Sequence, residues 1–444
     1  MAYQQPYGAP QYGAPPPGHQ QYPPPQGYPP PQQPYGAPPP QQYPQQGYGA
    51  PPPQQYGAPP PHQAYGAPPT PQYPPQSGYA PPPGPPPPQQ YGQQPYGAPP
   101  PQQGYGAPPP PQQYGAPPQS FGPPNPPSLG YGAPQIINFS GEMEADQCRK
   151  AMKGFGTDEK SLIQALANKD PLQMHAIRDA YSRKHRRNLL TDVQGETSGW
   201  LEEGLCAIIR GPLVQDCVNL HNAMAGPGTK EKVLNDVLLG RSNADMNAIK
   251  AEYRKMFRTS LESDVKGDLS MKTERHFLMV LAANRAEDSA PVVPQQIDQD
   301  VMEIYKATEG KMGTDELLVC NILSQRSDAQ IGAIAHTYQQ KFTRSLETVI
   351  KKEFSGHMEA ALFYQLQTGT DKAMRDAMLL EDAMAGAGTK DHLLVQRVVR
   401  IHWNRNHMQN VIGAYRHKYG KDLRSRIQGE TSGDYEKLMV ACIT

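Results

Sequence analysis

The first 141 residues contain no lysine, arginine, aspartate or glutamate, and all such residues of the 444-residue chain lie beyond them. The formal net charge is +0, so no basic surface is indicated and nonspecific binding to nucleic acid is not expected. Five cysteines are scattered without a CxxC pair, which favours buried thiols in a reducing compartment. No apolar run approaches the roughly 18 residues that a membrane span needs. Because the start has no signal-peptide pattern, we expect a cytoplasmic protein.

Residues 1–135 have almost no leucine, isoleucine or valine and repeat the phrase YGAPPPQQ with variations. Proline removes backbone donors and fixes φ, while glycine raises the entropy cost of ordering. We therefore predict a disordered tail, rich in Pro, Gly, Tyr and Gln, with polyproline II character. The tail is interpreted either as a solvated spacer or as a string of adhesive tyrosines that self-associates or recruits a tail-binding protein.

Four stretches of the charged part repeat one pattern at intervals of about seventy residues, which indicates an internal repeat. Each contains a glycine–threonine loop, written MKGFGT, MAGPGT, GKMGT and MAGAGT. A tyrosine follows, then apolar residues eight and twelve positions later, and an acid fifteen positions later. Because these spacings keep close to one helical face, we predict a buried stripe and an all-α fold without strands. The tyrosines are Tyr181, Tyr253, Tyr338 and Tyr415.

Each repeat is expected to contain several short helices, with one helix before the glycine loop and another after it. In the first copy we expect the Thr157 hydroxyl to cap the helix in TDEKSLIQALANK, with Asp158 and Glu159 favourably placed in its first turn. In the fourth copy, two additional residues near IHWNRNHM are interpreted as a loop insertion between helices. His402 and His407 in this stretch are expected to be solvated rather than to bind metal.

The glycine loop resembles several ligand-binding loops, and the flanking residues distinguish them. A Walker phosphate loop places lysine directly after the last glycine, whereas threonine stands there in all four copies. A dinucleotide loop follows a strand, and an EF-hand has acids at alternate positions of one loop; neither pattern is present. A loop of free carbonyls with a distant carboxylate remains, and these hard oxygen ligands suit Ca²⁺. Thr157, Thr229 and Thr314 are followed 39 positions later by Glu196, Asp268 and Glu353, and Thr389 is followed 41 positions later by Glu430.

The pattern K-G-x-G-T followed by Asp or Glu at this distance, in four copies, resembles the annexin family, and the likeness covers roughly residues 141–444. The resemblance implies four annexin-type repeats of about five helices each that form a curved disc after the tail. It also implies Ca²⁺ as the cofactor, held on the convex face, and binding to anionic phospholipid membranes rather than catalysis. The implied repeats are residues 141–211, 213–285, 297–369 and 372–444.

In the family, the carbonyls of the methionine and both glycines hold the ion together with the distant carboxylate. The resemblance therefore implies calcium sites in the first, second and fourth repeats. The implied ligands are Met152, Gly154, Gly156 and Glu196 in the first repeat, Met224, Gly226, Gly228 and Asp268 in the second, and Met384, Gly386, Gly388 and Glu430 in the fourth.

The third repeat departs from the family pattern, because Lys311 replaces the first glycine. Gly313 and Glu353 are retained, so we expect a site that is built differently. In the first repeat, Thr157 and Glu159 are candidates for a second, weaker calcium ion.

The expected function is calcium-dependent binding to anionic phospholipid membranes, with a role in membrane organisation or vesicle trafficking. The protein would be cytoplasmic and would become peripheral on membranes when calcium rises. Phe155 and Met312 stand at loop tips and are candidates for membrane contact or for ordinary packing. The alternative is a calcium-independent helical scaffold whose low-complexity tail recruits partners or self-associates.

Overall fold

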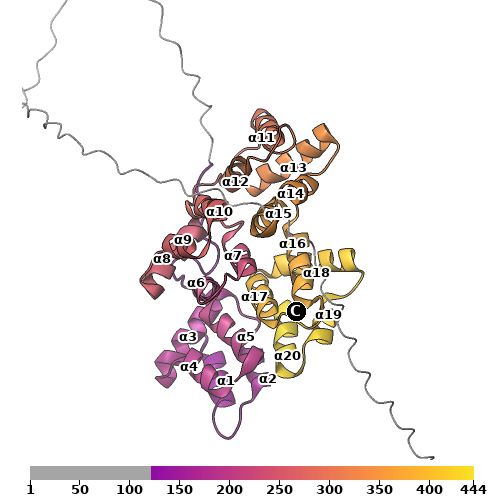
Figure 1. Ribbon diagram of the computed structural model, residues 1–444. Helices are drawn as coiled ribbons and strands as arrows, with labels where there is room; N and C mark the ends of the chain where they lie inside the picture. The colour runs from indigo at the N-terminus through magenta and orange to yellow at the C-terminus, as the bar shows by residue number, and fades with distance from the viewer. Residues whose placement is uncertain (1–121) are drawn as a thin grey trace, which may run out of the picture. The chain divides into compact units, whose positions relative to one another are not determined.

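The computed structural model describes residues 122–444, so the predicted tail lies outside the described residues as far as residue 121. Residues 122–444 form 20 α-helices and no strand, which confirms the all-α prediction (Figure 1). Five consecutive helices make up each repeat. Within the same range, no helix is both long and apolar enough to cross a membrane. The disc shape and its convex face stay predictions.

The twenty helices follow one another in four sets of five. Repeat 1 contains α1 (Glu142–Ala151), α2 (Glu159–Leu166), α3 (Pro171–His185), α4 (Leu189–Glu196) and α5 (Gly199–Arg210). Repeat 2 contains α6 (Pro212–Met224), α7 (Glu231–Leu238), α8 (Asn243–Phe257), α9 (Leu261–Asp268) and α10 (Met271–Leu281). Repeat 3 contains α11 (Pro294–Ala307), α12 (Glu316–Gln325), α13 (Asp328–Phe342), α14 (Leu346–Glu353) and α15 (Gly356–Thr370). Repeat 4 contains α16 (Lys372–Met384), α17 (Asp391–His402), α18 (Arg405–Tyr419), α19 (Leu423–Glu430) and α20 (Gly433–Ile443).

The apolar stripe that the repeat pattern predicts is buried in every copy. All four tyrosines are 0% exposed, and so are the apolar residues twelve positions after them. A buried hydroxyl needs a hydrogen-bond partner, and each of these tyrosines donates to a carboxylate of its own repeat. The acceptors are Asp192, Asp264, Glu309 and Glu381 for Tyr181, Tyr253, Tyr338 and Tyr415, respectively.

Repeats 1 and 4 share one hydrophobic core, although they are farthest apart in sequence. Leu162 and Ile208 of repeat 1 belong to the same buried cluster as Leu394 and Leu438 of repeat 4. Helix α2 contacts α20, and α5 contacts α17 (Figure 1). Two further clusters lie in repeats 2 and 3, and the first of them also includes Ala361 and Tyr364 of repeat 3. The shared core brings the first and last repeats, and with them their glycine loops, into one packed body.

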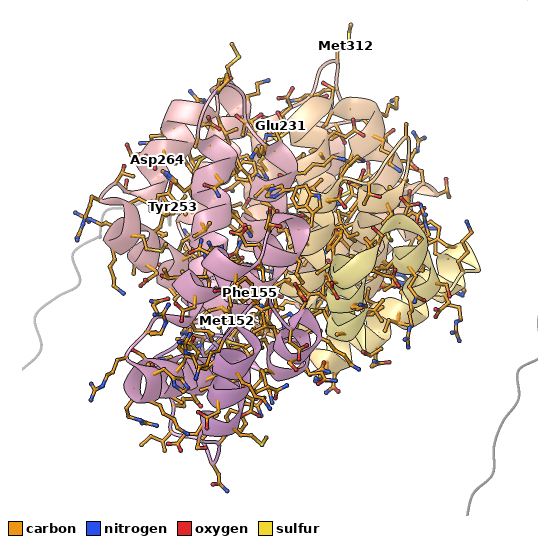
Figure 2. All side chains as sticks on the ribbon, turned by 90° about the horizontal axis from the view of Figure 1, so that it is seen from below. Met152, Phe155, Glu231, Tyr253, Asp264 and Met312 are labelled. Carbon is orange, nitrogen blue, oxygen red and sulfur yellow. The ribbon has the colours of Figure 1, made fainter. Side chains whose placement is uncertain are left out.

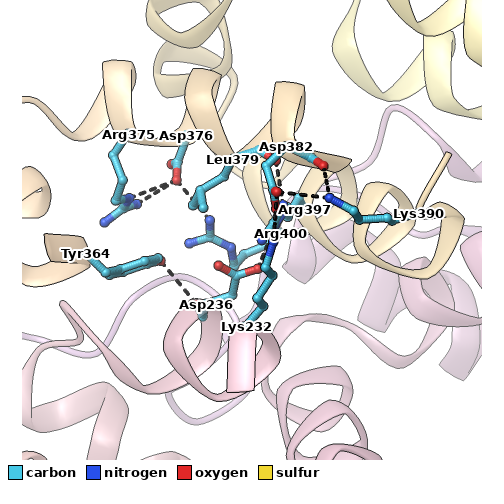
Figure 3. A network of polar contacts seen from close by, with 10 residues as sticks. All are labelled: Lys232, Asp236, Tyr364, Arg375, Asp376, Leu379, Asp382, Lys390, Arg397 and Arg400. Atoms are coloured by element: carbon cyan, nitrogen blue, oxygen red, sulfur yellow. Dashed lines mark hydrogen bonds and ion pairs between the residues drawn. The ribbon is translucent and has the colours of Figure 1, made fainter. Parts of the chain in front are cut away.

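A network of ion pairs joins repeat 2 to repeat 4 (Figure 3). Arg397 of α17 donates from Nε to Asp236 of α7 at 2.8 Å and from Nη1 to Asp382 of α16 at 2.9 Å. Lys232 and Lys390 also donate to the Asp382 carboxylate, at 2.8 and 3.0 Å. Because Lys390 directly follows the repeat-4 loop and Lys232 lies just beyond the repeat-2 loop, the network fixes these two loops relative to each other.

Residues 122–135 differ from the expectation of a disordered tail, because they make specific contacts with repeat 2. Tyr131 is 8% exposed; its hydroxyl donates to Asp216 at 2.5 Å and accepts from Arg241 at 2.8 Å. Ser128 donates from its amide and its hydroxyl to Asp245, at 2.7 and 2.6 Å. The boundary predicted at residue 135 therefore falls beyond the point where these contacts begin. Tyr131 stands in the same YGAP phrase as the tail, so composition alone did not separate it.

Two local expectations are wrong. Helix α2 is capped by Asp158, whose carboxylate accepts from Ser161 N at 3.0 Å, and not by Thr157. The additional residues of repeat 4 lengthen a helix and do not enlarge a loop: α17 has 12 residues, whereas its counterpart in repeat 1, α2, has 8. His402, the last residue of α17, is 6% exposed, and its Nδ1 lies 2.6 Å from the Val399 carbonyl oxygen. His402 is thus at a buried helix end and not in a solvated loop. His407 lies in α18, where it is half-buried with its Nε2 2.7 Å from Asp376 Oδ2, and residues 404–406 between the two histidines are exposed.

Candidate calcium sites

The glycine loop of repeat 1 joins α1 to α2 through a backbone conformation that only glycine adopts readily. The amide of Asp158 donates to the Ala151 carbonyl at 2.9 Å and closes the base of the loop. Gly154 and Gly156 have φ angles of 124° and 79°, which L side chains rarely adopt. A Cβ placed on either glycine would meet nothing within 4 Å, so the loop stands open and its conformation, not lack of space, requires glycine. The matching φ angles are 91° and 81° for Gly226 and Gly228 and 107° and 90° for Gly386 and Gly388.

In all four repeats the threonine of the loop is hydrogen-bonded to the distant acid that the sequence pairs with it. Thr157 Oγ1 donates to the Glu196 carbonyl at 3.0 Å and lies 3.3 Å from its Oε2. The fourth repeat does the same despite its longer spacing. The threonine-to-carboxylate distances are 2.6 Å for Thr229 and Asp268, 2.8 Å for Thr314 and Glu353, and 2.7 Å for Thr389 and Glu430. The fold therefore brings each loop and its acid together.

Each of the four acids is the last residue of its helix, at the ends of α4, α9, α14 and α19. The carboxyl end of a helix carries a partial negative charge and exposed carbonyl oxygens, so an added carboxylate is unfavourable there and a cation is favourable. The glycine loop faces this helix end through the threonine. A cation in the space between them would meet the acid, the helix end and the loop carbonyls.

The donor set at these loops fits calcium better than it fits zinc. Among residues 122–444 there is no cluster of three or more His, Cys, Asp or Glu side chains that could hold a metal ion. An ion would depend on main-chain carbonyls and one carboxylate, which are the hard oxygen ligands of Ca²⁺. The side chains of Met152 and Met384 are 4% and 0% exposed, so these residues have only their carbonyls to offer. The residues that are present therefore fit the ion in repeats 1 and 2.

The four acids differ in the cations beside them. Within the described part of the chain, Glu196 and Asp268 form no ion pair, whereas Glu353 lies 3.0 Å from Lys352 Nζ and Glu430 is paired with Arg426. The hydrogen bonds from Lys352 and Thr314 lower the pKa of Glu353. Hydrogen bonds from Thr389 and Arg426 lower the pKa of Glu430. The loop carboxylates of repeats 3 and 4 thus each have a cationic side chain beside them, whereas those of repeats 1 and 2 have none among the described residues.

The loop of repeat 3 is built differently from the others. Gly313 has a φ of 80° and keeps the second glycine conformation. Lys311 stands where the other loops have their first glycine, and it does not adopt a positive φ. A residue with a side chain pays roughly 1–2 kcal/mol in the left-handed region, so the backbone at Lys311 has a different conformation from that at the first glycine of the other loops. The Lys311 ammonium lies 3.8 Å from the Asp315 carboxylate. The secondary site predicted at Thr157 and Glu159 stays a prediction.

Large apolar side chains stand at two of the loop tips. Phe155 and Met312 are 112% and 103% exposed, so Phe155 does not pack in the core, which was the alternative for it. Figure 2 shows Met312 at the tip of its loop, beyond the ribbon, and Phe155 on the loop that follows Met152. Exposed apolar groups at a loop tip are poised to enter another apolar phase.

Trp200 is a candidate site residue that the sequence analysis missed. It follows Glu196 by four positions, is 39% exposed, and lines a surface pocket of about 550 Å³. Lys230 and Lys390, which directly follow the loop threonines of repeats 2 and 4, line the same pocket. Trp200 therefore shares this pocket with residues that border the glycine loops of repeats 2 and 4. A tryptophan directly after the ETSG stretch, which recurs at residues 430–433, was the available signal, since the chain contains only 2 tryptophans.

Comparison with known proteins places these loops in a family. An annexin sequence profile matches residues 143–208, 215–280, 299–364 and 375–442, one stretch in each repeat. Annexin C1 of Cryptococcus neoformans var. grubii is 42% identical over 325 residues, which are 72% of this chain and 68% of that protein. Human annexin A7 is 35% identical over 306 residues, which are 69% of this chain and 62% of that protein. The aligned region is thus about two thirds of the length of these relatives.

Solved structures show the same similarity. The structure of annexin III superposes with a TM-score of 0.65 at 29% identity and covers 71% of this chain and 97% of that one. The structure of chicken annexin V in complex with Zn²⁺ has a TM-score of 0.63, also at 29% identity, and covers 69% of this chain and 96% of that one. The chain belongs to the annexin family, which is known for calcium-dependent phospholipid binding.

Proposed function

We propose that this chain binds anionic phospholipid membranes when calcium rises, through ions held by the glycine loops of repeats 1 and 2. Membership of the annexin family supports the proposal. The observation that carries it is the contact of Thr157 with Glu196 and of Thr229 with Asp268. Each contact holds against an open loop a carboxylate that forms no ion pair within residues 122–444. A role in membrane organisation or vesicle trafficking is part of the same proposal.

The ligands of each site are few and mostly neutral. In repeat 1 the carbonyls of Met152, Gly154 and Gly156 and the carboxylate of Glu196 would hold the ion. One carboxylate per site supplies little charge, so the affinity for calcium is expected to be weak, on the order of 10⁻⁴ M. When bound, the ion supplies the positive charge that links the protein carboxylate to a lipid phosphate. The chain's formal net charge of +0 gives no such attraction by itself.

Several weak sites on one body act together. If both loops bind lipid through their ions, the second contact is intramolecular and raises the overall affinity by about 10²–10⁴-fold over one site. The shared core of repeats 1 and 4 and the ion pairs between repeats 2 and 4 keep the loops in fixed relation, which is the geometry that simultaneous binding requires.

Aromatic and apolar side chains near the loops add contacts with the lipid. Phe155 and Met312 would enter the boundary between headgroups and acyl chains, and Trp200 has the amphipathic ring that favours this boundary. Burial of an exposed phenylalanine side chain stabilises by about 1.5–3 kcal/mol. These residues would strengthen binding that calcium starts.

Co-sedimentation with phosphatidylserine vesicles across a calcium titration tests the proposal. The double variant Glu196→Ala, Asp268→Ala is expected to need at least about 10²-fold more lipid or calcium for half-maximal binding. The reason is that it loses the calcium-bridged lipid contacts of both repeat 1 and repeat 2. Asp288→Ala with Glu303→Ala is the matched control, since it removes two acids outside the four loops. Unchanged binding of the first variant would overturn the assignment of the sites.

The same titration separates the calcium-independent scaffold from the calcium switch. A scaffold that binds through its tail would show the same binding in calcium and in a chelator. Deletion of residues 1–121 would abolish that binding. The proposal expects the opposite result in both arms: chelator releases the chain from vesicles, and the shortened chain still binds them in calcium.

A further inference from the structure

Repeat 4 carries its own cation inside the glycine loop. Arg426 of α19 lies one helical turn before Glu430 and donates from Nη1 to the Glu430 carboxylate. Its Nη2 donates to the Met384 carbonyl oxygen at 2.7 Å. Met384 and Glu430 are two of the four ligands that the family pattern assigns to calcium in this repeat. One guanidinium thus contacts both of them.

Both oxygens of the Glu430 carboxylate already accept a hydrogen bond, one of them from a cation. Its Oε1 accepts from Arg426 and its Oε2 accepts from Thr389 at 2.7 Å. In repeats 1 and 2, by contrast, Oε1 of Glu196 and Oδ1 of Asp268 accept no hydrogen bond from any residue of the range 122–444. Calcium prefers both oxygens of a carboxylate, so the residues of repeat 4 do not fit the ion as they stand.

A reversal of charge between two helices explains why the arginine is there. In repeat 1 the position four residues before the acid is Asp192, and the position three residues before the loop methionine is Arg149. In repeat 4 these two positions are Arg426 and Glu381. The signs at the two positions are thus exchanged. In repeat 4 the two side chains form an ion pair, with Arg426 Nε 3.3 Å from Glu381 Oε2, whereas Asp192 of repeat 1 is paired with Arg187. The exchange puts the long cationic side chain on α19, where it reaches the loop.

Glu381 also keeps the arginine in place. Its carboxylate accepts from the buried Tyr415 hydroxyl as well as from Arg426, so it is fixed by the repeat core. The side chains of Arg426 and Glu381 are 19% and 22% exposed. A charged hydrogen bond at such partly shielded positions is stronger than a surface ion pair. Withdrawal of Arg426 from the loop would break contacts with three partners at once.

We propose that Arg426 acts as a built-in counter-ion that occupies the calcium position of repeat 4, so that this repeat stays closed and calcium-free while repeats 1 and 2 respond to calcium. The inference rests on the proposed function of the glycine loops and revises the fourth site that the family pattern implies. The calcium switch of the chain then lies in its first two repeats.

Equilibrium dialysis of the full chain against radioactive calcium, without lipid, tests this at about ten times the expected dissociation constant of 10⁻⁴ M. Arg426→Met frees Glu430 and the Met384 carbonyl and is expected to bind one more calcium ion per chain than the unaltered chain. Arg424→Met is the matched control: it removes the same charge from an exposed position of the same helix and is expected to bind no additional ion.

Two further variants keep the test decisive if Arg426→Met folds poorly. Glu430→Ala in the unaltered chain is expected to leave the number of bound ions unchanged, whereas Glu196→Ala removes one. Loss of an ion in Glu430→Ala, or no gain in a folded Arg426→Met, would overturn the role of Arg426 while leaving calcium binding itself intact. Absence of any bound calcium, with vesicle binding that survives a chelator, would instead overturn the proposed function.

Discussion

Arg397→Met tests how strongly the buried ion pairs hold repeats 2 and 4 together. Arg397 and Asp236 are each 1% exposed, with Nε of the arginine 2.8 Å from Oδ2 of the aspartate. Within residues 122–444, no hydrogen-bond partner other than Arg397 reaches the Asp236 carboxylate, because its Oδ1 has none. The substitution therefore leaves a buried carboxylate without a hydrogen-bond partner in this range.

The expected loss follows from that geometry. Removal of one partner of a buried pair costs about 3–5 kcal/mol. The second contact, to Asp382, is a smaller contribution, since Asp382 is 34% exposed and keeps Lys232 and Lys390; partly exposed pairs contribute about 0–1 kcal/mol. We expect the free energy of unfolding to fall by about 3–5 kcal/mol in total.

Urea unfolding followed by far-ultraviolet circular dichroism measures this loss. The double variant Arg397→Met, Asp236→Leu removes both charges and is expected to recover most of the stability, because apolar replacement of a whole buried pair is often neutral. A loss below about 1 kcal/mol in the single variant, or no recovery in the double variant, would refute the reasoning.

Three further changes test other parts of the structure by the same unfolding assay. Burial lowers the pKa of His276 to about 3 and of His357 and His402 to about 4. Because these histidines take up protons near pH 6.5 in the unfolded chain, the free energy of unfolding should be full above that pH and fall as the pH drops toward 4. A free energy of unfolding that does not change between pH 7.5 and 5 would contradict this. Met271 has a φ of 52° where Gly199, Gly356 and Gly433 stand in the other repeats, so Met271→Gly should stabilise by about 0.5–1 kcal/mol, and a destabilised variant would show that no strain is relieved. Tyr131→Phe removes the hydroxyl between Asp216 and Arg241 and should destabilise by about 1–3 kcal/mol; no change would mean that these two hydrogen bonds contribute nothing to stability.

The helices and the pairing of each loop with its acid were predictable because they recur. One amphipathic pattern repeated four times identifies the core tyrosines. A repeated fold explains why an acid returns at the same distance from the glycine–threonine pair in three copies and two residues later in the fourth. The structure bears out the buried stripe and brings Thr157 to Glu196. Comparison of the four repeats with one another thus identified positions that a single copy would not reveal.

The features that the sequence did not predict are those in which one copy differs from the others. Arg426 reads as an ordinary exposed arginine of an amphipathic helix, and its place in the loop depends on Glu381, which lies on a different helix. Tyr131 is surrounded by tail composition and is distinguished only by its long-range partners Asp216 and Arg241. The longer α17 arises because its apolar residues continue into the shared core of repeats 1 and 4, a tertiary effect that local pattern does not contain.

Release from vesicles on removal of calcium tests the central claim most directly. The full chain is bound to phosphatidylserine vesicles in calcium, excess chelator is added, and the fraction that still sediments is measured. We predict that the chain leaves the vesicles, because its net charge of +0 and its single carboxylate at each loop give no attraction to anionic lipid without the ion. A chain that stays on the vesicles after chelation would contradict the account.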